Sequence, residues 1–379
     1  MSGSTEIPGR STTLSDVDQP DVGRRGTLGQ VFDSRANALN AWRLALALGV
    51  IVWHSWVLTG RPAPPFALNQ FATQAFVDGF FAISGFLIPA SWLGNPRLRD
   101  YFLARGLRIL PGMWVCLFVT AFVIAPIGIA FQGGSAAKLL MSGGPLRFVI
   151  RNSAIAYVQF DIGGTPRGIP FPGMWNGSLW TLQYEVLCYV AVALLGLLGV
   201  LGHRWLFPVA FVLALVWTAL ASCPFDGGTV AQNAARFAVM FAAGGLIHRF
   251  RDVIPARWSL VAVSLAIVLV ADLLPDYRLI AAVPLAYAII VSGALIHNER
   301  LNLRTDLSYG TYIYACPMQQ LLVIAGLGAL NPLVFSIIAT VITLPAAALS
   351  WFLVEKPAMR LKARITRKRI RPGLTRSIP

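Results

Sequence analysis

The sequence contains few charged residues for its length. Only 12% of its 379 residues are Asp, Glu, Lys or Arg, whereas 56% are hydrophobic. An ordinary soluble domain is about 25% charged, because its surface faces water. The composition therefore argues against a soluble globular protein and favours a protein that lies within a membrane.

Cysteine and histidine are also scarce. There are four of each, the cysteines occur singly, and no CxxC pair or histidine cluster is present. Disulfide frameworks and zinc sites are recognised from such closely spaced residues, so we predict neither a structural disulfide nor a metal site. The cysteines are Cys116, Cys188, Cys223 and Cys316.

The sequence has no basic domain, although its formal net charge is +15. Its Lys and Arg residues form short blocks between apolar runs, so they offer no continuous surface for a nucleic acid duplex. Short basic blocks beside membrane spans are typical of loops that face the cytoplasm. We therefore expect no nucleic-acid partner and interpret the charge as a signal of topology.

Apolar runs are abundant, and each is long enough to cross a ~30 Å hydrocarbon core as a helix. Segments such as 190–201 are apolar throughout, whereas the strands of a membrane barrel alternate in polarity. The predicted fold class is all-α, a polytopic membrane helix bundle of about ten transmembrane helices. The expected spans are 38–58, 73–93, 109–131, 178–200, 205–222, 231–248, 258–274, 279–297, 307–328 and 333–354.

The chain divides into a membrane domain and two polar tails. Residues 1–36 predict a disordered tail, residues 37–355 the ten-helix domain and residues 356–379 a basic tail. Ten spans place both tails on one side, and the excess of Lys and Arg on that side predicts that it is cytoplasmic. The expected location is the cell inner membrane. The longest outer loop, 132–177, is rich in Gly and Pro turn signals, which indicate turns rather than a folded domain.

The first span contains two ionisable residues, Arg43 and His54, which are costly in a bilayer and therefore functional candidates. Their spacing corresponds to about three helical turns plus roughly 20°, with a rise of roughly 16 Å. Both side chains project from one face at different depths, so Arg43 could hold an anionic donor and His54 could act as a base. Alternatively, Arg43 is an interfacial anchor and His54 a structural residue of the core.

The second span places a carboxylate near the expected depth of the histidine. Asp78 could orient the His54 imidazole or raise its basicity. Further along, Ser84 and Gly85 form a small, polar stretch where a ligand or another helix can approach closely. Helix packing alone explains this stretch equally well. Because no GxSxG elbow is present, Ser84 is not predicted to be a nucleophile.

The next segment carries Arg105 and Arg108, which are i, i+3 neighbours on a helix surface. This arrangement suits the clamping of phosphate. Ordinary anchoring of a cytoplasmic loop explains the same block, so both interpretations remain open.

The fourth span begins SLWTLQYE and carries Glu185, the carboxylate expected deepest within any span. A carboxylate buried in a membrane needs a partner. Glu185 could therefore assist His54, or it could pair structurally with an arginine such as Arg236.

Taken together, these motifs resemble the acyltransferase 3 family. The resemblance runs from residue 37 to 360, and its motifs are weak singly but specific as an ordered set. In order they are Arg43-x10-His54, FFAISGFLI at 80–88, ARGLRILP at 104–111, SLWTLQYE at 178–185, LSYGTYIYACP at 307–317 and Glu355-Lys356-Pro357. Members of the family are multi-pass membrane enzymes that acylate, most often O-acetylate, surface and secreted carbohydrates.

The resemblance implies roles for the matching residues. Those that coincide with family motifs are Arg43, His54, Ser84, Arg105, Arg108, Trp180 and Glu185. Many members have a histidine just before the proline of the late Tyr-rich motif, whereas this sequence reads Ala315-Cys316-Pro317. His54 is therefore the better-supported base. The chain is expected to be a stand-alone member, without the hydrolase-like C-terminal domain of some relatives.

The implied reaction is transfer of an acyl group, most often acetyl, from cytoplasmic acyl-CoA to a hydroxyl of a carbohydrate or lipid-linked sugar. Arg43, Arg105 and Arg108 would hold the CoA phosphates. His54, assisted by Asp78 or Glu185, would take the proton of the hydroxyl. Ser84 and Trp180 are expected beside the substrate. The predicted partners are acyl-CoA as donor substrate, the acceptor sugar and membrane lipid, with no tightly bound cofactor.

Two other classes of protein fit some of these features. A transporter of a polar or anionic metabolite would also carry ionisable residues within the membrane, but would be expected to contain an inverted repeat. Neither FFAISGF nor SLWTLQYE has a second copy. An inert scaffold in a polysaccharide assembly complex would tolerate loss of Arg43 and His54.

Overall fold

The computed structural model describes residues 26–62, 70–221, 229–303 and 305–361. Over these ranges the regular structure is entirely helical, without a strand. The longer helices are α2 (Leu39–Leu58), α3 (Phe76–Gly94), α4 (Leu98–Val119), α8 (Leu182–Leu197), α9 (Leu206–Ala221), α10 (Val230–Arg249), α11 (Trp258–Ala271), α12 (Arg278–Leu295), α13 (Ser308–Ile324) and α14 (Pro332–Ser350). The shorter elements are α1 (Leu28–Val31), η1 (Phe71–Ala75), η2 (Thr120–Ile124), α5 (Ala125–Phe131), α6 (Ala136–Met141), α7 (Gly144–Asn152), η3 (Leu179–Thr181), η4 (Leu327–Ala329) and η5 (Trp351–Glu355).

The all-helical fold agrees with the sequence prediction, but the count of ten spans is not confirmed. Among the described residues, seven helical segments are long and apolar enough to cross a membrane. These seven are Leu39–Leu58, Phe71–Gly94, Leu98–Phe131, Leu179–Leu197, Val230–Arg249, Arg278–Leu295 and Pro332–Leu361. The other three expected spans coincide with α9, α11 and α13, which have 16, 14 and 17 residues. At 1.5 Å per residue these helices are shorter than the hydrocarbon core. The protein is an integral membrane protein of several spans.

Two glycines allow α3 and α10 to pack closely. A side chain on Gly85 of α3 would meet the Phe241 carbonyl oxygen at 1.9 Å, and one on Gly244 of α10 would meet the Ala82 carbonyl oxygen at 2.0 Å. Small residues permit such approach between membrane helices. The expectation that another helix approaches at Ser84-Gly85 is therefore confirmed.

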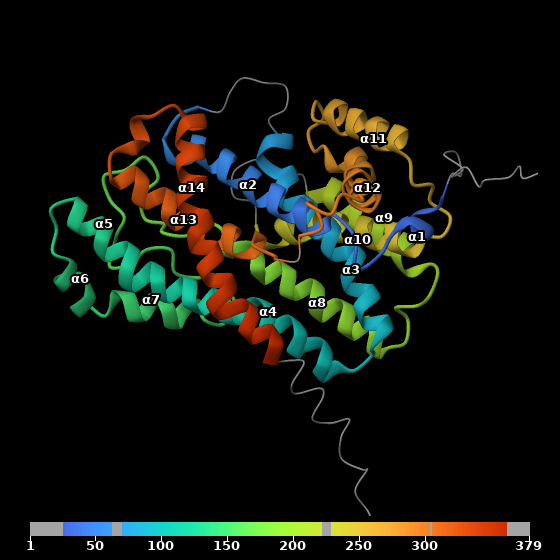
Figure 1. Ribbon diagram of the computed structural model, residues 1–379, viewed down its shortest axis with the longest axis horizontal. Coiled ribbons are helices and arrows are strands. Elements are labelled where there is room, and N and C mark those ends of the chain that lie inside the picture. The colour runs from blue at the N-terminus through green and yellow to red at the C-terminus, as the bar shows by residue number, and fades with distance from the viewer. Residues whose placement is uncertain (1–25, 63–69, 222–228, 304, 362–379) are drawn as a thin grey trace, which may run out of the picture.

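The helices form two groups that meet around α2. In Figure 1, α3, α10 and α12 lie on one side and α13 and α14 on the other, while α4 and α8 run along the lower edge. Helix α2 contacts α3 and α12 in the first group and α13 and α14 in the second. Its residues therefore face both groups.

Residues 26–36 pack against the bundle, although the sequence predicted a disordered tail to residue 36. Leu28 is completely buried. Its backbone N–H donates to the Ile254 carbonyl at 2.8 Å, and that of Ala256 donates to the Gly26 carbonyl at 3.0 Å. The rest of that tail (1–25), most of the basic tail (362–379) and Cys223 lie outside the described residues.

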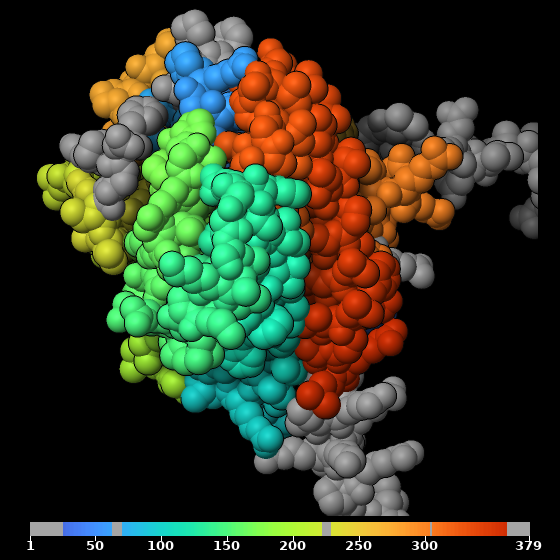
Figure 2. Space-filling model, turned by 90° about the vertical axis from the view of Figure 1, so that its left-hand side faces the viewer, coloured from blue at the N-terminus to red at the C-terminus, as the bar shows by residue number. Residues whose placement is uncertain are grey.

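The loop 132–177 contains two short helices, α6 and α7, that the turn signals did not predict. It is fixed by Trp175, which is completely buried and whose Nε1 donates to the Thr165 hydroxyl at 3.1 Å. In Figure 2 this segment, teal to light green, lies beside the orange-red α13 and α14. The loop therefore forms a structured cap over one end of the bundle.

Candidate active site

A cavity of about 360 Å³ lies among α2, α3, α4, α8 and α13. Its volume falls in the range of small-molecule sites, roughly 300–1,000 Å³. The polar residues that line it are Arg43, Ser84, Ser91, Arg105, Arg108, Thr181, Glu185, Tyr189, Ser308, Tyr309 and Tyr312. Apolar side chains of α3, among them Phe80, Phe81 and Leu87, form much of the remaining wall. Five of the eight residues that the sequence singled out therefore lie around one cavity.

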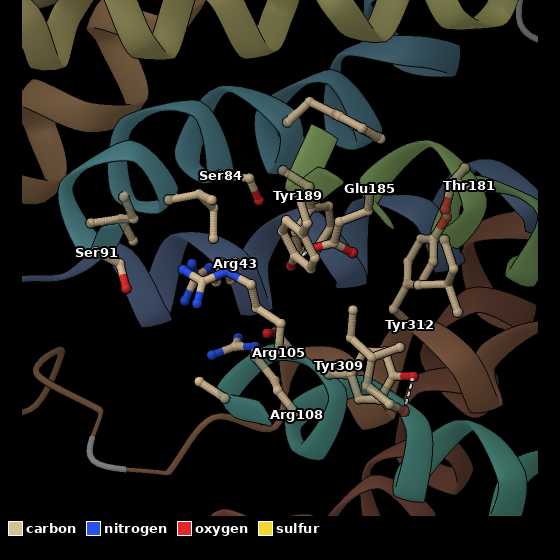
Figure 3. Close-up of a pocket in the computed structure, with 18 of the residues that line it drawn as sticks. Arg43, Ser84, Ser91, Arg105, Arg108, Thr181, Glu185, Tyr189, Tyr309 and Tyr312 are labelled. Carbon is tan, nitrogen blue, oxygen red and sulfur yellow. Dashed lines mark hydrogen bonds between the residues drawn. The ribbon is translucent and has the colours of Figure 1, made fainter. Parts of the chain in front are cut away.

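Three arginines converge on one part of this cavity (Figure 3): Arg43 from α2, and Arg105 and Arg108 from α4. The guanidinium carbon of Arg105 lies 3.9 Å from the centroid of the Tyr101 ring and 5.5 Å from that of Tyr189. Its Nη1 also donates to the Tyr101 carbonyl at 3.2 Å. Three positive charges around one cavity favour an anionic ligand.

Asp306, which sequence reasoning missed, joins two of these arginines. Its Oδ2 accepts a hydrogen bond of 2.5 Å from Arg108 and lies 3.8 Å from Nη1 of Arg43. Its Oδ1 accepts from the Ser308 backbone N–H and hydroxyl. Burial acts to raise the pKa of this carboxyl, but the two guanidinium groups outweigh it and hold the pKa below the usual range. The available signal was an acidic residue directly before the motif LSYGTYIYACP.

The exposure of the two arginines indicates where the cavity opens. The Arg108 side chain is 37% exposed, that of Arg43 14% and that of Asp306 8%. Arg108 therefore lies nearest the mouth, with Arg43 further inside.

Glu185 faces the cavity from α8 (Figure 3), one helical turn before Tyr189, whose hydroxyl donates to Oε1 of Glu185. Further along the wall, the hydroxyls of Thr181 and Tyr312 are 2.7 Å apart. A carboxylate and several hydroxyls thus line the cavity beyond its three arginines.

Ser84 lines the cavity while its neighbour Gly85 contacts α10. Helix packing at Gly85 is therefore compatible with ligand approach at Ser84, because consecutive residues of α3 point about 100° apart. Trp180 does not line the cavity. Its ring packs on Tyr184 and Phe237, at centroid distances of 5.7 and 5.6 Å, so it supports the wall from behind.

His54 does not line this cavity either. It lies about three turns along α2 from Arg43, a rise of roughly 16 Å. Its Nδ1 is buried, and no hydrogen-bond partner for it lies within the described ranges. In particular, no described carboxylate accepts a hydrogen bond from this nitrogen.

Asp78 participates in a different buried cluster. Its Oδ2 accepts a 2.7 Å hydrogen bond from Nε of Arg278 and a second bond from the Tyr277 hydroxyl. Nε of Arg236 lies 3.9 Å from its Oδ1. Asp78 and Arg278 are 0% and 2% exposed, so this ion pair joins α3 to α12 inside the bundle. The contacts do not support the expectation that Asp78 orients His54.

In the part of the chain that the structure describes, no three His, Cys, Asp or Glu side chains are grouped so as to hold a metal ion. Cys116 and Cys316 are buried free thiols. The Cys316 sulfur accepts a hydrogen bond from the Gly177 backbone N–H at 3.0 Å. Cys316 thus holds the segment that leads into η3 and α8. Many members of the resembled family have a histidine at this position.

Arginines, hydroxyls and a carboxylate thus line one cavity among the helices of an integral membrane protein. The family model for an acyltransferase domain, acyltransferase 3, matches residues 36–352. The chain belongs to this family and is an acyltransferase, which sets the transporter interpretation aside.

Two relatives match over nearly their full lengths. An O-acetyl transferase of Shigella phage Sf6 is 27% identical over 337 residues, covering 85% of this chain and 96% of the relative. Nodulation protein 10 of Rhizobium leguminosarum bv. viciae is 26% identical over 364 residues, covering 88% and 96%. No solved structure matches the chain significantly.

Proposed function

We propose that the protein transfers an acyl group, acetyl in the first instance, from cytoplasmic acyl-CoA to a hydroxyl of a surface or secreted carbohydrate. The observation that carries this proposal is the convergence of Arg43, Arg105 and Arg108 on a cavity with a largely apolar α3 wall. CoA has phosphates at one end and an uncharged arm with a thioester at the other. Guanidinium forks suit the phosphates, and the apolar wall suits the arm.

The donor enters at the side where Arg108 is exposed. We assign this side to the cytoplasm because CoA is found there and because the basic residues of the predicted topology gather there. With the ten spans that the sequence predicts, this assignment makes both termini cytoplasmic, and we propose the inner membrane as the location. The loop 132–177 then lies on the outer side, where it can contact the acceptor.

His54 is the proposed general base. In the reaction, the acceptor oxygen forms a bond to the thioester carbonyl carbon and the carbon–sulfur bond breaks. The proton leaves the hydroxyl, is taken by His54 and passes to the CoA thiolate, so direct transfer needs no covalent enzyme intermediate. The His54 Nδ1 is buried and has no hydrogen-bond partner among the described residues, which supports a role in receiving a ligand. Glu185 is the better candidate to assist, because Asp78 is already paired with Arg278 inside the bundle.

Acetyl is favoured over other acyl groups because a relative of 27% identity is named an O-acetyl transferase. The acceptor is proposed by class only, as a hydroxyl of a carbohydrate or lipid-linked sugar. The acceptor can be identified by mass spectrometry, which compares the acetyl groups on surface glycans from a deletion strain and its parent. Identical glycans in the two strains would remove carbohydrate from the proposal.

The central test uses His54→Ala in proteoliposomes supplied with acetyl-CoA. Acetyl-CoA hydrolysis and acetylated product should both disappear, while insertion and detergent extraction remain normal. The matched control is His203→Ala, because His203 is exposed and has no proposed role. Transfer by His54→Ala at the wild-type rate would contradict the assignment of the base.

A further inference from the structure

Helix α13 carries two consecutive glutamines, Gln319 and Gln320, both 0% exposed. Buried amides are costly unless they are hydrogen-bonded. Their side chains donate in different directions, Gln319 to α2 and Gln320 to the loop 132–177. They have no part in donor binding or in the proton transfer proposed above.

Gln319 binds the turn of α2 that contains His54. Its Nε2 donates to the Ile51 carbonyl at 2.9 Å and to the Ser55 hydroxyl at 3.0 Å. The Ser55 hydroxyl in turn donates to the same Ile51 carbonyl at 2.7 Å. Because a carbonyl can only accept, the amide of Gln319 must present its NH₂ group to α2. The interaction therefore depends on a donor at this position.

Ile51 is a neighbour of His54 on the helix surface, and Ser55 follows His54 in the chain. At 100° per residue, His54 is about 60° from Ile51 and about 100° from Ser55 around α2. Ile51 also belongs to a buried apolar cluster with Ala315 and Cys316 of α13. The α2 turn is thus held by apolar packing and by two hydrogen bonds from one side chain.

The imidazole itself lacks the usual means of orientation. A histidine base is generally aligned by a hydrogen bond to its second nitrogen, but the described residues supply no partner for Nδ1 of His54. Without such a bond, its direction depends on its rotamer and on the position of the helical turn that carries it.

We propose that Gln319 is a positioning residue that sets the direction of the His54 imidazole by holding the Ile51–Ser55 turn of α2 against α13. The inference rests on the proposed role of His54 as base. Gln320 has a different role, because its Nε2 donates to the Phe171 and Met174 carbonyls at 2.9 and 2.7 Å. It fixes the loop that precedes η3.

The test compares Gln319→Leu with Gln320→Leu in the full-length protein in proteoliposomes. Each change removes a buried donor of the same kind from the same helix, but only the first faces α2. The readouts are kcat, KM for acetyl-CoA, and the rate at which diethyl pyrocarbonate modifies His54, resolved by peptide mass spectrometry. Modification of His203 and His297 is followed in the same samples.

Gln319→Leu should lower kcat about tenfold, because small displacements of a catalytic group have effects of this size or larger. KM for acetyl-CoA should stay within about twofold, since the arginines are untouched. The modification rate of His54 should change severalfold, whereas His203 and His297 react as before. Gln320→Leu should leave the reactivity of His54 unchanged.

Gln319→Glu is the conservative variant. A neutral carboxyl keeps one O–H donor for Ile51, whereas the ionised form has none. The kcat of Gln319→Glu relative to wild type should therefore be higher at acidic pH and fall as pH rises. A merely structural role would not produce this dependence.

Ser55→Ala is the substitute test if Gln319→Leu does not insert. It removes one acceptor of the Gln319 amide, and the same readouts apply.

The outcomes separate this inference from the proposed function. Wild-type kcat and His54 reactivity in Gln319→Leu, with an inactive His54→Ala, would overturn the positioning role alone. Equal activity of His54→Ala and wild type would instead overturn the proposed base. Equal changes in the reactivity of all three histidines would show loss of structure and also count against the positioning role.

Discussion

Arg108 donates a hydrogen bond of 2.5 Å to Asp306, a residue 198 positions further along the chain. Because Arg43 lies 3.8 Å from the same carboxylate oxygen, one acidic side chain joins α2 and α4 at the cavity. The shared counterion reduces repulsion between the two guanidinium groups and restricts their spacing. The phosphates of the proposed donor would therefore meet arginines that are already in place.

Asp306→Asn should raise KM for acetyl-CoA about tenfold, equivalent to ~1.4 kcal/mol, and leave kcat nearly unchanged. Asparagine preserves the size of the side chain but removes the charge that restrains the two arginines. Initial rates in proteoliposomes over a range of acetyl-CoA concentrations measure this effect. Asp252→Asn is the control, because its side chain is 77% exposed. An unchanged or lower KM in Asp306→Asn would contradict the restraint.

The Asp306 carboxyl should also make the thermal stability of the protein depend on pH. Its pKa is held below the usual range, and a group with a depressed folded-state pKa stabilises the fold above its unfolded pKa, about 3.9 for Asp. That contribution is lost as pH falls through the lower folded-state value. The difference in thermal midpoint between wild type and Asp306→Asn should therefore be constant from about pH 5 to 8 and shrink only below about pH 4. A difference that varies around neutral pH would contradict the assignment.

Arg43→Lys tests recognition of phosphate by a guanidinium fork. Lysine keeps the charge but loses the bidentate geometry, so KM for acetyl-CoA should rise about tenfold. With S-acetyl-pantetheine, which has no phosphates, the variant and wild type should have similar KM values. The control is Arg167→Lys, because Arg167 is exposed on the loop 132–177 and does not line the cavity. A similar increase with both donors would show that Arg43 acts on the thioester arm or on the fold.

Much of the candidate site could be predicted from sequence. Ionisable side chains are costly in a bilayer, so those within apolar spans are candidates for a functional role. Arg43 and Glu185 were selected in this way, Arg105 and Arg108 by their i, i+3 spacing and Ser84 from a small, polar stretch. All five lie around one cavity. The helical class followed from long apolar runs. The predicted number of ten spans is not confirmed, because α9, α11 and α13 are shorter than their apolar runs suggested.

Partners across the bundle could not be predicted. Asp78 was matched to His54 by depth along two helices, but depth does not specify the direction in which a side chain points. Its partner is Arg278, 200 positions away. Gln319 contacts Ile51 over a separation of 268 positions, and no local pattern marks such a contact.

Gly85→Ala tests the close approach of α3 and α10. The added methyl group would meet the Phe241 carbonyl oxygen at 1.9 Å, so the helices must separate, at a cost of about 1–3 kcal/mol. Thermal unfolding in detergent should show a lower midpoint. Gly94→Ala, at the end of the same helix with nothing within 4 Å of the added carbon, should be neutral. Equal midpoints for the two variants would contradict the packing.

Asp78→Asn distinguishes a structural from a catalytic Asp78. It removes the closest counterion of Arg278, which is 2% exposed, and breaking such a pair costs about 3–5 kcal/mol. The double variant Asp78→Asn/Arg278→Met removes both charges of this pair, and an uncharged replacement of a buried pair is often neutral. It should recover part of the thermal midpoint, because Asp276 loses its 3.1 Å contact with Arg278. Acyl transfer should recover with it, since Asp78 joins α3 to α12 and does not act on His54. A double variant that is stable but inactive would instead place Asp78 in the chemistry.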